Sequence, residues 1–169
     1  TGKPASYASP ALAEFGGLRM ILTMNAKALI GVNADTGDLL FTHPHITEYD
    51  VNALMPIYHD GHIFISSGYG SGSQMFKLTV NGDKARVEQV WENKQLDNHH
   101  GGVLLLEGYL YGSSAGGVWI CLDWKTGETQ YAERGVGKGS LCWADGMLYL
   151  FGERDGKVGL ATCSPDGFE

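Results

Sequence analysis

Short apolar runs alternate with glycine-containing turns along most of this chain. Three segments share one pattern, in which an acidic residue and a glycine precede an alternating apolar strand: 60–67, 107–114 and 145–152. A second apolar run comes before each of them, so the Asp-Gly or Glu-Gly pair falls where a two-residue hairpin turn requires a positive φ. Each segment therefore predicts a strand, a tight turn and a second strand.

A degenerate fourth copy lies upstream, where residues 10–13 lead through two glycines into residues 18–23. The turn glycines of the four copies are 44, 47 and 38 residues apart: Gly17, Gly61, Gly108 and Gly146. This spacing is close to the period of roughly 40–50 residues that propeller blades show, each blade being a four-stranded sheet.

The second half of each copy predicts further strands. A third apolar run is followed by a turn cluster and, in the first three copies, by a fourth run: 38–41, 87–91 and 128–131. No segment keeps an apolar period of 3.6 residues, so almost no helix is expected. We therefore predict an all-β chain, a β-propeller of about four blades of four-stranded antiparallel sheet that form an incomplete ring, the last blade lacking its fourth strand. The predicted blades are 7–44, 45–93, 94–134 and 135–169.

Composition and charge narrow the possible partners. The 169 residues are 43% hydrophobic, enough for one domain with a core, and the net charge of −7 argues against nucleic acid as a partner. No apolar stretch approaches the roughly 18 residues that a membrane span needs. The N-terminus lacks the basic-then-apolar order of a signal peptide, although its polar start leaves room for a leader or upstream region outside this sequence.

The three cysteines, Cys121, Cys142 and Cys163, lie in or beside apolar runs rather than in a ligand-spaced cluster. We expect buried free thiols that act as small hydrophobic side chains, with one surface disulfide as the alternative.

Residues 122–131 read aliphatic-Asp-x-x-Thr-Gly-Glu followed by an aromatic residue, after a Gly-x-aliphatic-Tyr strand. This pattern resembles the repeat of the pyrroloquinoline-quinone-like, or quinoprotein-type, β-propellers, and the resemblance extends from about residue 9 to residue 167. It implies roughly six to eight blades around a central channel. It also implies export to the periplasm or the cell surface, since the family includes quinone-dependent alcohol and sugar dehydrogenases, an outer-membrane assembly scaffold lipoprotein and many exported bacterial proteins.

The chain departs from this family in two ways. The family usually places a tryptophan after the Thr-Gly turn, where it locks adjacent blades, whereas this chain has Phe41, Trp91 and Tyr131. The resemblance implies pyrroloquinoline quinone with calcium as a cofactor, but the adjacent cysteine pair of the alcohol dehydrogenases is missing, which weakens that inference. The cofactor therefore stays unknown at this level.

Four blades leave the outer faces of the first and last sheets uncovered. Two partners could cover them: the remaining blades of a longer chain, or a second copy that completes the ring.

The loops that enter the innermost strands should converge at one end of the channel. They comprise residues 7–9, 49–52, 98–101 and 137–140. We predict that six of their side chains bind a polar ligand there: Tyr49, Asp50, Asn52, His99, His100 and Lys138. Asp50 and either histidine could act as a base and its orienting partner, and Lys138 could stabilise an anionic group. No metal site is assigned, because adjacent histidines on a strand point to opposite faces and only a loop would let both bind one ion.

A polar channel lining without any activity is the alternative interpretation of these residues. Other polar and aromatic positions carry weaker expectations. His43, His45 and His59 should lie near outer turns in solvent, and Trp119, Trp124 and Trp143 should belong to the core between blades. The sequence thus favours a non-catalytic propeller module that binds a polar ligand or a protein partner at the channel mouth; the alternative is a part of a quinone-dependent alcohol or sugar dehydrogenase.

Overall fold

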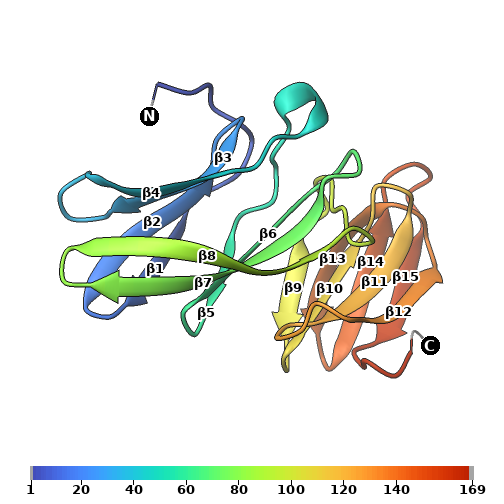
Figure 1. Cartoon of the computed structure of the whole chain (residues 1–169). Coiled ribbons are helices and arrows are strands. Elements are labelled where there is room, and N and C mark those ends of the chain that lie inside the picture. Colours follow the sequence, from blue (N-terminus) through green and yellow to red (C-terminus); the bar gives the residue numbers. More distant parts are fainter. Residues whose placement is uncertain (1, 168–169) are drawn as a thin grey trace.

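The computed structural model describes residues 2–167 and is all-β. Four antiparallel sheets lie side by side in sequence order (Figure 1). Within these residues the only helical element is the single 3-10 turn η1 (Glu48–Asp50). None of the described helical residues forms a segment long and apolar enough to cross a membrane. The fold is therefore the incomplete β-propeller that the repeat predicts.

Each sheet is a meander whose first strand is innermost and whose strands follow in sequence order. Blade 1 comprises β1 (Ala11–Phe15), β2 (Leu18–Met24), β3 (Ala28–Asn33) and β4 (Leu39–Pro44). Blade 2 comprises β5 (Ile57–His59), β6 (His62–Ser67), β7 (Gly72–Asn81) and β8 (Lys84–Asn93). Blade 3 comprises β9 (Val103–Leu106), β10 (Tyr109–Ser113), β11 (Val118–Asp123) and β12 (Thr129–Arg134). Blade 4 has three described strands, β13 (Gly139–Ala144), β14 (Met147–Gly152) and β15 (Val158–Thr162).

The first hairpin of each blade has the backbone conformation that the sequence predicts. Asp60, Glu107 and Asp145 have φ values of 44°, 49° and 51°, and the glycine after each also has a positive φ. Two successive positive φ angles are typical of the type I′ turn, whose twist matches that of the strands it joins. The acidic-glycine pairs therefore fix the register of these hairpins.

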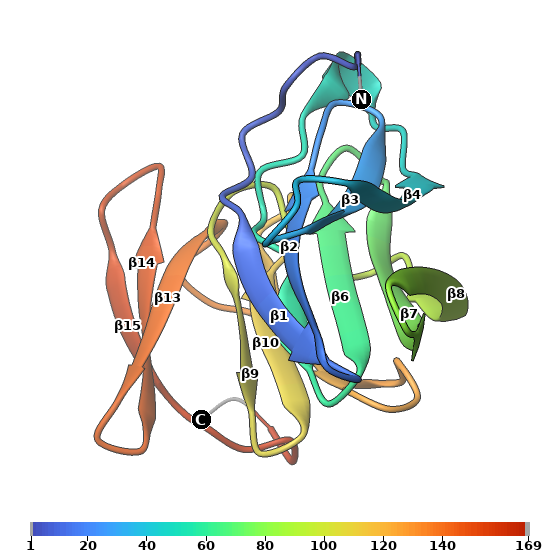
Figure 2. The same cartoon turned by 90° about the vertical axis from the view of Figure 1, so that its left-hand side faces the viewer.

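The hydrophobic core lies between the blades and forms three clusters, one at each junction. Met20 and Leu22 of blade 1 pack against Ile63 and Phe76 of blade 2. The second cluster joins Phe64 and Met75 of blade 2 to Leu110, Ile120 and Leu122 of blade 3. The third joins Tyr111, Trp119 and Cys121 of blade 3 to Leu148 and Leu150 of blade 4. Figure 2 shows β13–β15 beside β9 and β10.

A tryptophan fastens the second junction at its outer rim. The Trp91 indole lies on Gly127, in the Thr-Gly turn of the next blade, where an added Cβ would be 2.5 Å from the ring. Its Nε1 donates a hydrogen bond to the Trp124 carbonyl oxygen at 3.2 Å. The Asp123 carboxylate shapes this turn by accepting from the amides of Lys125 and Thr126 at 2.8 and 2.7 Å. The turn shaped by Asp123 is thus the surface on which the Trp91 indole packs.

The other two aromatic residues at this repeat position do not form the same lock. Phe41 packs in the first cluster, over Gly31 of its own sheet, and Tyr131 packs beside the third cluster. The corresponding connection in blade 2 is the tight β7–β8 hairpin rather than a Thr-Gly turn. Phe41 therefore has no Thr-Gly turn in the next blade to pack on. The lock requires an aromatic residue in one blade and a Thr-Gly turn in the next.

The outer face of blade 4 is uncovered and apolar. Tyr149, Phe151, Val158 and Leu160 are exposed on β14 and β15. Of the three cysteines, all free, Cys121 is buried as expected, but Cys142 is exposed because it shares this face with Tyr149 and Leu160. Trp119 and Trp124 are buried as predicted, whereas Trp143 is half exposed and does not belong to the core.

Candidate ligand site at the channel mouth

The loops that enter the first strands meet at one end of the sheets, the upper end in Figure 1. The inner strands β9 and β13 contact each other there. Their backbones approach so closely that a Cβ on Gly101 would lie 1.8 Å from the Gly139 carbonyl oxygen. Glycine at this position lets the two loops converge, which positions the side chains on either side of them.

Side chains from the loops of blades 2, 3 and 4 form a continuous line across this end. The Tyr49 and Tyr69 rings pack edge to face with their centroids 5.2 Å apart, and the Tyr69 and His99 rings pack in the same way with centroids 4.9 Å apart. The His99 and His100 rings are 4.7 Å apart. Beyond the histidines the line continues to a lysine and a glutamate. We call this line the mouth row, and it comprises Tyr49, Tyr69, His99, His100, Lys138 and Glu153.

Both tyrosines of the mouth row have backbone conformations that are unfavourable for bulky residues. Their φ angles are 62° for Tyr49 and 58° for Tyr69, in the left-handed region. Despite this strain the side chains are 71% and 42% exposed, so burial of the rings does not compensate for it. Strained conformations of this kind cluster at binding and catalytic sites.

The polar end of the mouth row is a hydrogen-bonded network. Lys138 Nζ donates to Glu153 Oε1 at 2.8 Å and to His99 Nδ1 at 3.1 Å, and His100 Nε2 lies 2.6 Å from Glu153 Oε2. Because an ammonium group can only donate, His99 Nδ1 is the acceptor and the ring proton is on Nε2. Burial, followed by the Lys138 charge, lowers the pKa of His99, so this imidazole is neutral at pH 7.

Glu153 is ionised in this network. The hydrogen bond from Lys138 lowers the pKa of Glu153 below its usual range. The network thus presents a neutral imidazole whose Nε2–H has no acceptor within residues 2–167, beside an ammonium group and a carboxylate whose charges offset each other. Such an arrangement offers several hydrogen-bond donors and acceptors to a polar ligand.

Two of the six predicted site residues have other roles. Asp50 forms an ion pair with Lys27 and does not contact either histidine, so the predicted pairing of Asp50 with a histidine is wrong. Asn52 is fully buried: its side-chain amide donates to the Asn25 carbonyl oxygen at 2.9 Å, and its Oδ1 accepts from Ser67 at 2.6 Å. Asn52 therefore holds the loop between blades 1 and 2 in place rather than lining the channel.

Sequence reasoning missed Tyr69 and Glu153. Tyr69 lies in the glycine-rich connection between β6 and β7, and Glu153 follows β14 at the start of the next connection. Both lie in loops that follow the second strand of a blade, whereas the predicted site drew only on loops that precede the first strand. Aligning the loop after each second strand would have identified both residues, because that loop reaches the same end of the sheet.

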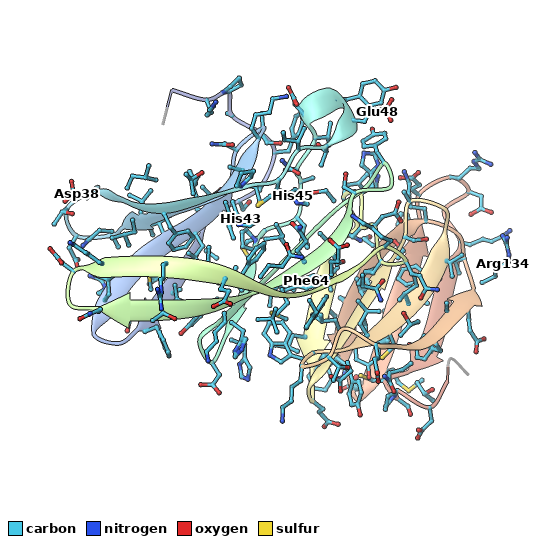
Figure 3. All side chains as sticks on the ribbon, in the orientation of Figure 1. Asp38, His43, His45, Glu48, Phe64 and Arg134 are labelled. Atoms are coloured by element: carbon cyan, nitrogen blue, oxygen red, sulfur yellow. The ribbon has the colours of Figure 1, made fainter. Side chains whose placement is uncertain are left out.

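His45 also differs from its expectation. It is buried between blades 1 and 2, with Nδ1 2.8 Å from the Gln74 side-chain oxygen and Nε2 3.0 Å from Ser67 Oγ. Burial lowers the pKa of His45. Figure 3 shows His45 and His43 between β4 and the strands of blade 2. The prediction of solvent exposure failed for His45 because the chain turns inward directly after β4.

Comparison with known proteins supports the fold. No protein-family profile and no curated protein sequence matches the chain. The computationally designed protein Ika4 superimposes with a TM-score of 0.69 at 14% identity, and the match covers 96% of each chain. BamB from Moraxella catarrhalis gives 0.66 at 16% identity, covering 97% of this chain and 54% of BamB. Hsv2p from Kluyveromyces lactis gives 0.56 at 12% identity, covering 92% and 49%.

These likenesses show a propeller fold. The chain spans about half the length of BamB and of Hsv2p. At such identities the match carries no information about ligands.

The cofactor implied by the family resemblance does not fit the described residues. A calcium-bound quinone needs oxygen ligands grouped around the ion, and residues 2–167 contain no group of three His, Cys, Asp or Glu side chains placed to hold a metal. The sequence also has no adjacent cysteine pair. We therefore derive no chemistry that depends on this cofactor.

Proposed function

We propose that this chain is a non-catalytic propeller module whose mouth row binds a polar ligand or the polar side chains of a protein partner. The observation that carries this proposal is the pair of tyrosines held in left-handed conformations with exposed rings, in contact with the His-Lys-Glu network. The propeller fold itself supports a binding or scaffold role, since loops from successive blades converge on one surface.

The chemistry of the row suggests what it recognises. The two tyrosine rings offer an apolar surface with hydroxyl groups, and His99 Nε2 adds a donor beside the compensated Lys138–Glu153 pair. Aromatic rings beside fixed polar groups suit a ligand that has a flat or apolar face and several hydroxyl or amide groups. A hydroxylated ring or a short polar peptide has these properties.

The proposal is tested by titrating the ¹⁵N-labelled chain with glucose and with a Gly-Tyr-Gly peptide, while amide chemical shifts are recorded. We expect shifts at residues 49, 69, 99, 100, 138 and 153, and their loss in a His99→Ala/His100→Ala variant that is still folded by circular dichroism. His59→Ala and His62→Ala, at the opposite end of blade 2, are the matched controls. Shifts that persist in the double variant, or no shift with either probe, would end the proposal.

The family, the location and the ring are parts of the same proposal. The Asp123 turn and the indole seated on it support membership of the quinoprotein-type repeat family, and export to the periplasm or cell surface follows from that membership. The uncovered apolar face of blade 4 supports completion of the ring by further blades. These blades belong to a longer chain, with a second copy of this chain as the alternative.

Light scattering distinguishes the two sources of blades. A monomeric mass for the isolated 169-residue chain, with exposed apolar surface detected by dye binding, supports a longer chain. A dimer of stable mass across a hundredfold dilution instead supports pairing of two copies. A stable monomer that binds no dye and needs no further blades would contradict ring completion in either form.

A further inference from the structure

A cleft of about 460 Å³ lies beside the mouth row, between blades 3 and 4. Three connections line it: residues 115–117 between β10 and β11, residues 134–138 between β12 and β13, and residues 153–157 between β14 and β15. Its volume is in the range of pockets that enclose small-molecule ligands. The cleft shares only Lys138 and Glu153 with the mouth row, so it is a separate feature of the same end of the molecule.

Cations are concentrated in this cleft, although the chain as a whole carries a net charge of −7. Four of the chain's twelve lysine and arginine residues line the cleft: Arg134, Lys138, Arg154 and Lys157. Only two carboxylates accompany them, those of Glu153 and Asp155. The local charge is therefore opposite in sign to that of the protein.

Both carboxylates already have partners. Glu153 accepts from Lys138 at 2.8 Å, and Asp155 accepts from Lys157 at 2.8 Å. Neither Arg134 nor Arg154 forms an ion pair with any carboxylate in the described part of the chain. The two guanidinium groups are thus the uncompensated charges, and Figure 3 shows Arg134 projecting from the blade 3 and blade 4 side of the molecule.

The backbone of the cleft adds further donors. Residues 135–137 read Gly-Val-Gly, and Gly137 has a φ of 84°. Within residues 2–167 no acceptor is found for the amides of these three residues. Free amides next to a left-handed glycine can bind an anion, and a guanidinium group binds carboxylate or phosphate oxygens through two parallel hydrogen bonds.

We infer that this cleft binds a small molecule that carries two or more anionic oxygen groups, either carboxylates or phosphates. Arg134 and Arg154 bind the anionic groups, and the amides of residues 135–137 complete their hydrogen bonding. The Lys138–Glu153 ion pair lies where this site meets the mouth row, which recognises uncharged polar groups. The inference goes beyond the proposed function, because its two arginines have no part in the mouth row.

Isothermal titration calorimetry at low ionic strength tests the inference with citrate, pyrophosphate and uncharged glucose as probes. We expect citrate or pyrophosphate to bind, and the affinity to fall roughly tenfold or more in Arg134→Gln/Arg154→Gln. The preferred anion identifies the carboxylate or the phosphate chemistry. The matched control, Lys84→Gln/Arg86→Gln, removes the same charge from the β7–β8 hairpin and should change the affinity less than about twofold.

Two results would overturn the inference. One is the absence of binding by both anions, and the other is an equal loss in the control variant, which would show a general charge effect instead of a site. A Tyr49→Ala/Tyr69→Ala variant separates this inference from the proposed function. It should keep anion binding while it loses the chemical-shift changes at the mouth row, so either idea can fail without the other.

Discussion

Tyr111 and Tyr149 occupy the same place in successive blades, three residues after the turn glycine, but only one of them is buried. Tyr111 is 2% exposed between blades 3 and 4, where it lies opposite Cys121 of the adjacent strand β11. Tyr149 is 38% exposed on the outer face of blade 4. Phe64 and Met20, at this place in blades 2 and 1, are fully buried.

The difference shows what a repeat sequence specifies. The hairpin register decides that this residue points toward the following blade, and the presence of that blade decides whether the side chain is buried. A solenoid-like array behaves in the same way, since each repeat is stabilised mainly by its neighbours. Equivalent positions in different blades are therefore natural pairs for mutational tests.

The largest expected difference is between Tyr111→Ala and Tyr149→Ala. Removal of the buried ring should lower the free energy of unfolding by about 4 kcal/mol, because it leaves a cavity at the junction. Removal of the half-exposed ring should cost about 1 kcal/mol or less. Urea denaturation of both variants measures the two values. Equal losses would mean that blade 4 is covered in solution or that the third junction is not formed as described.

The next comparison concerns the Thr-Gly turns. Gly127 and Gly37 have φ values of 73° and 81°, so alanine at either position carries the same left-handed strain of about 1–2 kcal/mol. Only at Gly127 would the new Cβ meet a ring, since nothing lies within 4 Å of a Cβ at Gly37. Gly127→Ala should therefore cost about 2 kcal/mol more than Gly37→Ala, as measured by thermal or chemical denaturation. A smaller cost at Gly127 would show that Trp91 is not seated there.

The pH dependence of stability should reveal the buried histidine of the first junction. His45 is buried there, and its burial lowers its pKa in the folded state, whereas in the unfolded chain its pKa is about 6.5. Below that pH the unfolded state binds a proton that the folded state does not, so stability should fall as the pH drops from 7 toward 5. His45→Gln should flatten this dependence in urea titrations across that range. Exposed His59→Gln should leave it unchanged, and a wild-type-like slope in His45→Gln would refute the assignment.

The last comparison is between two cysteines, and it is expected to change stability least. Chemical labelling of their thiols tests directly whether the outer face of blade 4 is uncovered. Cys142 is exposed beside Tyr149, whereas burial raises the pKa of Cys121 to about 12. Iodoacetamide should modify Cys142 quickly and Cys121 only after unfolding, as followed by mass spectrometry. Protection of Cys142 that increases with protein concentration would show that a second copy covers the face.

The mouth row was predictable in part. His99, His100 and Lys138 were identified because the repeat places their loops at one end of the channel, and the structure brings them within contact of one another. Asp50 could not be assigned from the repeat, because its partner Lys27 comes from a loop in another hairpin. Glu153 supplies the carboxylate instead, and which carboxylate reaches a histidine depends on how far adjacent blades are rotated.

The sequence by itself determined the blades: hairpin turns need positive φ at particular residues, and alternation of apolar residues sets which face of each strand is buried. These are local properties, so they can be read from residues close together in the chain. Only the tertiary structure decided the burial of His45, the exposure of Cys142 and the seat of Trp91, since each depends on the neighbouring blade. Contacts between blades join residues far apart in the chain, such as His45 and Ser67, 22 positions apart, or His99 and Lys138, 39 positions apart, and no local pattern fixes their relative placement.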